Sequence, residues 1–469
     1  MVQPSEPLPT PLPPTEPAET SAAEPSPTQL QEVPAGQFLT LPEAIALGFR
    51  RQPRLRVYLE GIQQAQGLSD VAFAPFLPSV GAGYSVGGYD LNVGGQPLQL
   101  GGQPGFTVLP PGFALPVGLN IHTNYELAEL KMQWLICDFG RRMSRYNATK
   151  LFIEIRRLQT DRAYQTVANE IALAYYTVLR SQALLRVAEE SVLRDEDERD
   201  VAQKLAKGGV IEREKVLRAE VKLAESRRLK DAAEEGVAVA HAALNLAIGQ
   251  QFDAPVQVVE PPQIPDFNVS LSYCLQLAIA QRREFLVARR TIQVAQEGSK
   301  TARADFAPKI VGEGALFDLQ QGTPSGHADI ALGFIKLEWA CFEGGKRVAE
   351  QRISDSKIRE AMAQTQSIAD TIAFQVNETY RRTTTARLGI LRSRPAVEQA
   401  KENYRLVRAL ALQGDATPSE ITDAETALTR AEQNYSNSVY DYLSAISKLD
   451  YAIGIPPNRT SSVSVAPGG

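Results

Sequence analysis

Residue types that commonly bind metals or act as catalytic bases are scattered in this chain. The three histidines are His122, His241 and His327. None has a metal-ligating or triad partner nearby in sequence, so we interpret them as structural or exposed. The three cysteines are Cys137, Cys274 and Cys341. They form no CxxC or Cys/His cluster and predict neither a zinc site nor a disulfide framework. We expect no metal and no cofactor.

One glycine-rich segment, Glu343-Gly344-Gly345-Lys346-Arg347, could suggest phosphate binding. It lacks the G-x-x-x-x-G-K-S/T spacing of a phosphate-binding loop. Nucleophile-elbow and dinucleotide-binding motifs are also absent from the sequence. With no motif that argues for catalysis, we predict that the protein is not an enzyme.

Composition narrows the possible partners and the fold class. The 469 residues are 43% hydrophobic and 22% charged, which fits an ordered protein, and the net charge of -5 makes nucleic acid an unlikely partner. No segment approaches the roughly 18–20 apolar residues of a membrane helix. A bilayer-integrated form of this chain would therefore have to be a β-barrel. The cysteine usage suits a periplasmic protein without disulfides and equally a cytosolic one.

Both ends are expected to lack regular structure. Residues 1–37 are rich in Pro, Glu, Ser and Thr and predict a disordered tail, because such a segment cannot bury a core. The N-terminus has no basic region followed by an apolar one, so we expect that any export signal has been trimmed. Residues 455–469 predict a second flexible tail.

The chain is internally duplicated. With an offset of 205 positions, Trp134–Gly249 aligns with Trp339–Gly454 without a gap, and an offset of 230 aligns Leu41 with Leu271. The difference places an insertion between Pro78 and Trp134. We predict one repeat over 38–249 and a second over 271–454, joined by a proline-rich linker over 250–270 with little regular structure.

Each repeat predicts the same order of elements. A helical stretch (41–74 and 271–305) precedes two strands (79–88 and 122–135, then 309–318 and 328–339), where apolar and polar residues alternate. Long helical runs follow. Arg141–Ala206 contains no Pro or Gly and would span about 100 Å as a helix. Arg347–Gln413 matches it, and both runs reverse at glycines into a second helix with a coiled-coil-like seam.

Four strands cannot close a barrel that carries an aqueous channel, and open strand edges are not tolerated in lipid. Three copies would give about twelve strands, a usual number for outer-membrane barrels. The same symmetry would arrange the helical hairpins into an α-barrel beneath them. The predicted fold class is therefore mainly α with a small β part, in a duplicated chain that contributes four strands to a trimeric β-barrel.

Several motifs in this order resemble TolC-type outer-membrane efflux proteins over roughly residues 38–455. They are the D/E-x-G-R/K-R turns at Asp138–Arg142 and Glu343–Arg347, and the A-I-G helix endings at 247–249 and 452–454. The resemblance implies an outer-membrane homotrimer of a diderm bacterium with a long periplasmic extension. It would contact outer-membrane lipid and dock to a periplasmic adaptor protein and an inner-membrane pump. The implied function is the exit duct of a tripartite efflux or type I secretion system.

The resemblance also implies site residues. The adaptor-contacting tips map onto two segments, Gly209-Val210-Ile211 and Gly414-Asp415-Ala416. A constricting ring of carboxylates maps onto Glu420 and Asp423, one helical turn apart. The family pattern is not matched in the first repeat, which has Lys215 and Arg218 at these positions. We expect these cations to pair with acidic residues of a neighbouring helix and close a cation-preferring gate. Alanine replacement of both acids should then raise single-channel conductance.

Simpler interpretations stay open for these residues. Glu420 and Asp423 could be a solvated helix start, where acids favour the first turn. Trp134 and Trp339 could form an interfacial belt or pack at the junction between barrel and tube. The whole chain could also be a soluble coiled-coil scaffold without a pore, although that alternative does not explain two alternating strand pairs at matching positions.

Overall fold

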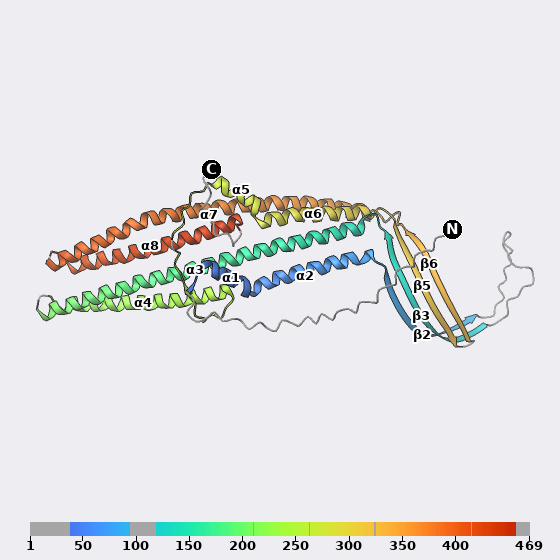
Figure 1. The fold of residues 1–469 in the computed structure, drawn as a ribbon, viewed down its shortest axis with the longest axis horizontal. Coiled ribbons are helices and arrows are strands. Elements are labelled where there is room, and N and C mark those ends of the chain that lie inside the picture. The colour runs from blue at the N-terminus through green and yellow to red at the C-terminus, as the bar shows by residue number, and fades with distance from the viewer. Residues whose placement is uncertain are drawn as a thin grey trace, which may run out of the picture.

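The computed structural model describes residues 38–93, 119–209, 211–261, 263–322, 325–413 and 415–455. The tail expected over 1–37, and all but the first residue of the tail expected over 455–469, lie outside these ranges. The described chain is elongated, with a four-stranded sheet at one end and helices that run from it to the other end (Figure 1). No helix among the described residues combines the length and apolarity needed to cross a membrane.

Two long helical hairpins dominate the molecule. The first consists of α3 (Arg141–Lys207) and α4 (Arg213–Ile248), and the second of α7 (Lys346–Gln413) and α8 (Pro418–Ile453). Helix α3 has 67 residues and α7 has 68, as the runs without helix breakers predict. Helix α7 continues through Pro395, although an interior proline removes one backbone hydrogen bond.

The helical stretch at the start of each repeat, expected over 41–74 and over 271–305, consists of two helices. The helices are α1 (Leu41–Arg51), α2 (Pro53–Phe73), α5 (Leu271–Gln281) and α6 (Arg283–Ala304), and a short 3-10 turn, η1 (Ala74–Phe76), follows α2. Gln52 is extended because a residue that precedes proline is disfavoured in the helical region. Arg282 is also extended, with ψ of 119°, although no proline follows it.

Tertiary hydrogen bonds hold the side chains of both break residues. The amide of Gln52 donates to the carbonyl of Ala247 at 2.9 Å, and the guanidinium of Arg282 donates to the carbonyl of Ala452 at 2.7 Å. Both acceptors lie in the last turn of a hairpin helix, where carbonyls lack helical partners. The break therefore connects the first helices of each repeat to the end of its hairpin.

The main sheet unites the two repeats. Its strands are β2 (Ser79–Val93), β3 (Leu119–Cys137), β5 (Lys309–Gly322) and β6 (Ser325–Glu338). Their order is β2-β3-β5-β6, and all neighbouring pairs are antiparallel. The strands extend beyond the alternating cores predicted from sequence, because backbone pairing continues past the residues that alternate. The pairing of β3 with β5 joins repeat one to repeat two.

Among the described residues of the linker over 250–270, regular structure is limited to one two-residue strand. Strand β4 (Gln257–Val258) pairs in parallel with β1 (Phe38–Leu39). The backbone N–H of Val259, which follows β4, donates to the hydroxyl of Tyr175 on α3 at 3.0 Å. The linker is thus attached to the first hairpin.

Two apolar cores lie where the hairpins meet the short helices, and the repeat relates them. Ile171 and Leu244 belong to the first core, and their counterparts Val376 and Leu449 belong to the second. All four side chains are buried, with 0–1% exposure. These cores anchor each hairpin at its base and leave the tips to be positioned by contacts along the helices.

Candidate functional site

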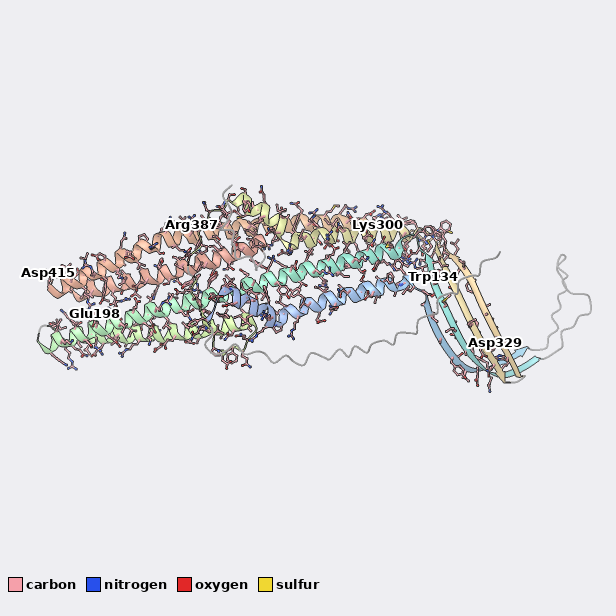
Figure 2. The ribbon with its side chains drawn as sticks, viewed as in Figure 1. Trp134, Glu198, Lys300, Asp329, Arg387 and Asp415 are labelled. Carbon is pink, nitrogen blue, oxygen red and sulfur yellow. The ribbon has the colours of Figure 1, made fainter. Side chains whose placement is uncertain are left out.

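The two helix reversals expected as tips lie at the end of the molecule opposite the sheet (Figure 1). Asp415 marks this end, whereas Trp134 marks the junction with the sheet (Figure 2). Asp415 is exposed, and its backbone N–H donates to the carbonyl of Leu410 at 3.0 Å. Gly209 has a φ of +76°, a left-handed conformation that favours glycine. Ile211 and Ala416 are half-buried, and Val210 and Gly414 lie outside the described residues.

Glu420 caps helix α8. Its carboxylate accepts from the backbone N–H of Thr417 at 2.6 Å and from the Thr417 hydroxyl at 2.9 Å, and its own N–H donates to that hydroxyl at 3.4 Å. This is a reciprocal capping box that satisfies N–H groups at the helix start. The backbone and side-chain hydrogen bonds from Thr417 lower the pKa of Glu420. The helix-start interpretation therefore accounts for the position of this carboxylate within one chain.

The other expected gate residues lie near Glu420 in sequence but are not joined to it. Asp423 is exposed on the next turn of α8. Arg218 pairs with Glu214 of its own helix at 2.5 Å, and Lys215 is half-buried. Among the described residues, no ion pair of one chain links Lys215 or Arg218 to Glu420 or Asp423. The lock expected from these cations is therefore not formed within one chain, where Arg218 is instead paired with Glu214.

A buried ionic network that the sequence analysis did not single out connects the two hairpins. Glu425 of α8 is 2% exposed and pairs with Lys222 of α4. The Lys222 ammonium also lies 2.9 Å from Asp195 and 2.7 Å from Glu198, both of α3. Arg194 of α3 adds contacts of 3.4 Å to the Glu425 carboxylate and 3.1 Å to the Thr429 hydroxyl. This interhairpin network lies on the tip side of the molecule, where Glu198 is labelled in Figure 2.

The network balances desolvation against pairing. Burial disfavours the charge of Lys222, but the hydrogen bonds that its ammonium donates to Glu198 and Glu425 outweigh this effect, so the pKa of Lys222 is raised. Burial raises the pKa of Glu425, and the bond to Lys222 opposes that shift. Glu425 follows Asp423 closely and aligns with Glu220 in the repeat, but alignment alone does not distinguish a buried carboxylate from an exposed one. Two of its partners in the network, Lys222 and Asp195, align with Ala427 and Ala400 in the second repeat, and these alanines carry no charge.

Both tryptophans lie at the junction of sheet and helices. The indole N–H of Trp134 donates to the carbonyl of Phe76 at 3.1 Å, and that of Trp339 donates to the carbonyl of Phe306 at 3.2 Å. The rings stay 43% and 56% exposed. The amphipathic indoles thus hold the turn between helix and sheet while they present apolar surface outward.

The strand register gathers an apolar band on one face of the sheet. Cross-strand neighbours in this band are exposed large side chains, among them Val80, Met132, Trp134, Leu316 and Ile335. The opposite face of β2 and β3 carries polar groups, including an ion pair of 2.7 Å between Lys131 and Glu129. An exposed apolar band of this length is rare on a soluble monomer and indicates an interaction surface.

Two groups of side chains have the composition of a cation site. Asp318, His327 and Asp329 lie within 4.8 Å of one another and are exposed on β5 and β6. Each carboxylate is 3.3 Å from a ring nitrogen of His327, because the register pairs Asp318 with Asp329. His327 is exposed, and the pairing of β5 with β6 brings Asp318 to it from the neighbouring strand. The other group is Asp195, Glu198 and Glu425, where the ammonium of Lys222 already supplies the positive charge.

Comparison with known proteins identifies the family. A profile of the family described as "Outer membrane efflux protein" matches residues 49–250 and 274–455. The chain belongs to the outer membrane efflux protein family. The resemblance to TolC-type outer-membrane efflux proteins, inferred from the turns and the helix endings, is thereby confirmed.

Individual relatives of this outer membrane efflux protein are distant. The alkaline protease secretion protein AprF of Pseudomonas aeruginosa is 23% identical over 182 residues, which are 38% of this chain and 38% of AprF. The outer membrane protein VceC of Vibrio cholerae has a TM-score of 0.71 at 18% identity, and covers 88% of this chain and 96% of its own. The outer membrane channel CmeC of Campylobacter jejuni has a TM-score of 0.73 at 14% identity, with coverage of 88% and 85%. These structures confirm the predicted fold of one chain, which is mainly α with a small β part.

Proposed function

We propose that three copies of this chain form an outer-membrane exit duct for passive transport from the periplasm to the outside. The observation that carries the proposal is the order β2-β3-β5-β6. The outer strands β2 and β6 each have one neighbour among the described residues, so each has an open edge. A sheet in lipid needs every edge paired. Pairing of β6 with β2 of the next copy would close about twelve strands from three chains.

The two faces of the sheet suit such a barrel. The apolar band would face the acyl chains, and the face with Lys131 and Glu129 would line the channel. Trp134 and Trp339 would then lie at the periplasmic boundary of the bilayer, where amphipathic indoles are enriched. Their hydrogen bonds to the start of the sheet would set the angle between barrel and helical tube.

The hairpin tips are the part of the molecule best placed to meet other components. They lie farthest from the sheet, which supports their assignment to the periplasmic end of the duct (Figure 1). We infer that Gly209, Ile211, Asp415 and Ala416, together with Val210 and Gly414, contact a periplasmic adaptor that connects the duct to an inner-membrane pump. The name of AprF places that relative in protein secretion, whereas the family description refers to efflux. Tripartite efflux and type I secretion are both compatible with this proposal.

The gate proposal rests on the same trimer. Glu420 and Asp423 of three chains would place six acidic groups near the tips and favour cations. The cap formed with Thr417 supports this use of Glu420, because hydrogen bonds that lower its pKa keep the carboxylate ionised. Lys215 and Arg218 would have to reach these acids from a neighbouring chain.

Planar-bilayer conductance of the detergent-purified protein, with its mass in micelles, tests the duct. We expect particles of about three times the 51.2 kDa chain mass that open discrete, cation-preferring channels. A folded monomer or dimer that stays dispersed without detergent and conducts nothing would contradict the duct and favour a soluble coiled-coil scaffold.

A further inference from the structure

The duplication extends to individual contacts, so a contact in one repeat specifies where its counterpart should lie. The indole bonds of Trp134 and Trp339 use acceptors that are also counterparts, Phe76 and Phe306. The bonds from Gln52 and Arg282 obey the same two offsets, 230 positions before the insertion and 205 after it. The offsets therefore relate tertiary contacts as well as sequence.

One set of contacts has no counterpart inside the chain. Helix α3 packs against α6 and α8, which belong to the other repeat. The counterparts of these three helices are α7, α2 and α4. Among the described residues, α7 makes no extended contact with α2 or α4. The ribbon explains this, because α2 and α4 lie along one edge of the molecule and α7 along the other (Figure 1).

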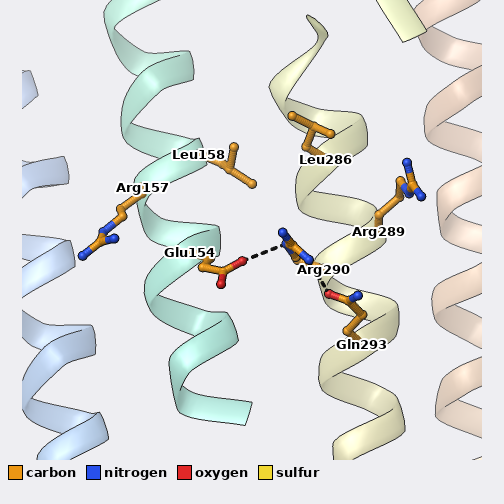
Figure 3. Close-up of a pocket in the computed structure, with 7 residues that line it drawn as sticks. All are labelled: Glu154, Arg157, Leu158, Leu286, Arg289, Arg290 and Gln293. Carbon is orange, nitrogen blue, oxygen red and sulfur yellow. Dashed lines mark hydrogen bonds and ion pairs between the residues drawn. The ribbon is translucent and has the colours of Figure 1, made fainter. Parts of the chain in front are cut away.

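A charge pair marks the seam between α3 and α6. The carboxylate of Glu154 lies 2.8 Å from the guanidinium of Arg290, across a groove that both helices line (Figure 3). The counterpart of Glu154 is Arg359 on α7, and the counterpart of Arg290 is Glu60 on α2. Both positions keep opposite charges, but with the polarity reversed. Glu60 and Arg359 are exposed, and neither forms an ion pair in the part of the chain that the structure describes.

The seam between α3 and α8 carries a second, independent signal. One contact of this seam within the chain is polar, since the hydroxyl of Ser447 donates to the side-chain oxygen of Asn169 at 3.1 Å. The counterparts are Ala242 on α4 and Phe374 on α7. Phe374 is 66% exposed within one chain. An adjacent apolar residue of α4, Leu246, is 73% exposed, so both open edges present apolar surface at the matching height.

We propose that α7 of one copy packs against α2 and α4 of the next copy in the same way that α3 packs against α6 and α8. In this interface Arg359 pairs with Glu60 of the next copy, and Phe374 covers Ala242 and Leu246 of the next copy. The inference rests on the proposed trimer and specifies its helical interface. Such a head-to-tail contact is heterologous and closes into a ring when the rotation permits.

The reversed polarity has a direct use in assembly. Glu60 meets Arg359 favourably, whereas a chain shifted by one repeat would bring Glu60 opposite Glu154 and Arg290 opposite Arg359. Like charges at an interface disfavour the wrong register. The pair therefore distinguishes the seam between copies from the seam within a copy.

Site-directed cross-linking tests the interface. The variant E60C/R359C is made with C137S and C341S, while Cys274 is kept because its thiol is buried and burial raises its pKa to about 11. A short bismaleimide is used, since Arg and Glu side chains can pair across a Cα separation that a disulfide cannot span. We expect cross-linked dimers and trimers on a denaturing gel. The matched control E154C/R290C should cross-link within one chain and run as a monomer.

The outcomes separate this inference from the proposed function. A normal trimer mass in micelles with no ladder from E60C/R359C, while the control pair reacts, would overturn the interface and leave the trimer standing. Particles of monomer mass would remove the trimer and the interface together.

Charge reversal gives a second measurement that does not depend on cysteine chemistry. E60R alone and R359E alone each place like charges together and should lower the temperature at which the trimer dissociates in detergent. The double variant E60R/R359E recreates the polarity of Glu154 and Arg290 and should restore most of that temperature. Additive losses in the double variant would overturn the pairing.

Discussion

Glu420 combines a structural role with a proposed electrostatic one, and two substitutions separate them. T417A removes the hydroxyl of the cap and keeps the carboxylate, whereas E420Q keeps an acceptor oxygen and removes the charge. Loss of the cap should cost about 1 kcal/mol of stability. If the ring of charge sets selectivity, E420Q should reduce cation preference, measured as the reversal potential in a salt gradient, and T417A should not at neutral pH. Equal selectivity of E420Q and wild type would exclude Glu420 from the gate.

The lowered pKa of Glu420 fixes a sign for pH dependence. A carboxyl with a depressed folded pKa contributes stability above its unfolded pKa, and this is lost as pH falls through the folded value. In T417A the bonds that lower the pKa are fewer. Cation preference should therefore fade at a higher pH in T417A than in wild type during an acid titration of the reversal potential. An identical titration would show that Thr417 does not tune this charge.

Lys222 is the residue on which the interhairpin network depends. K222M leaves Asp195, Glu198 and Glu425 without their shared cation, which should lower the free energy of unfolding by about 2–4 kcal/mol once partial exposure is allowed for. The control K230M removes a solvent-screened surface pair with Glu234 and should change it far less. Denaturant unfolding in detergent measures the free energy of unfolding of both variants. Equal losses would contradict the role of Lys222 in holding the interhairpin network together.

Alkaline pH probes the same network. The folded pKa of Lys222 is raised, so its contribution to stability is complete below the unfolded pKa and is lost as pH rises through the folded value. The unfolding temperature of the wild type should fall as pH rises through this alkaline range, and that of K222M should fall less. Parallel curves for the two proteins would assign the alkaline loss to other groups.

At the scale of elements, the helix endings explain why A-I-G recurs. Gly249 has a φ of +83°, and a Cβ there would lie 3.1 Å from the backbone of Arg51 and Gln52. G249A should therefore destabilise the first core by more than about 1 kcal/mol. The control G298A lies in α6 with nothing near its added Cβ and should stabilise by up to about 1 kcal/mol. Thermal unfolding measures both variants. A lower unfolding temperature in both would show that the effect is not specific to Gly249.

The sequence predicted elements whose signals are local. The long helices and the alternating strand cores follow from residue spacing, and the repeat located their partners in the other half. The break at Arg282 was missed because no proline marks it, and the bond that holds its side chain goes to Ala452, distant in sequence. Strand β4 was missed because two residues become a strand only through pairing with β1. Burial of Glu425 likewise depends on three helices meeting.

At the scale of the molecule, the duct and the scaffold differ in where the protein resides. Produced behind an export signal in a diderm bacterium, it should sediment with outer-membrane markers and require detergent for extraction, because the apolar band on the sheet is exposed in one chain. Release of folded protein with the soluble fraction would contradict membrane residence. This fractionation is independent of conductance and of trimer mass.

The interhairpin network is confined to one type of seam. Lys222, Asp195 and Glu198 have Ala427, Ala400 and Asn403 as counterparts, so the boundary between neighbouring copies would lack this buried cation and two of its acids. If the tips separate to admit cargo, the helix contacts between chains are then weaker than those within a chain. The aperture would widen at the three boundaries between chains and not at the three seams within chains. The two hairpins of each chain would then move together as one rigid unit.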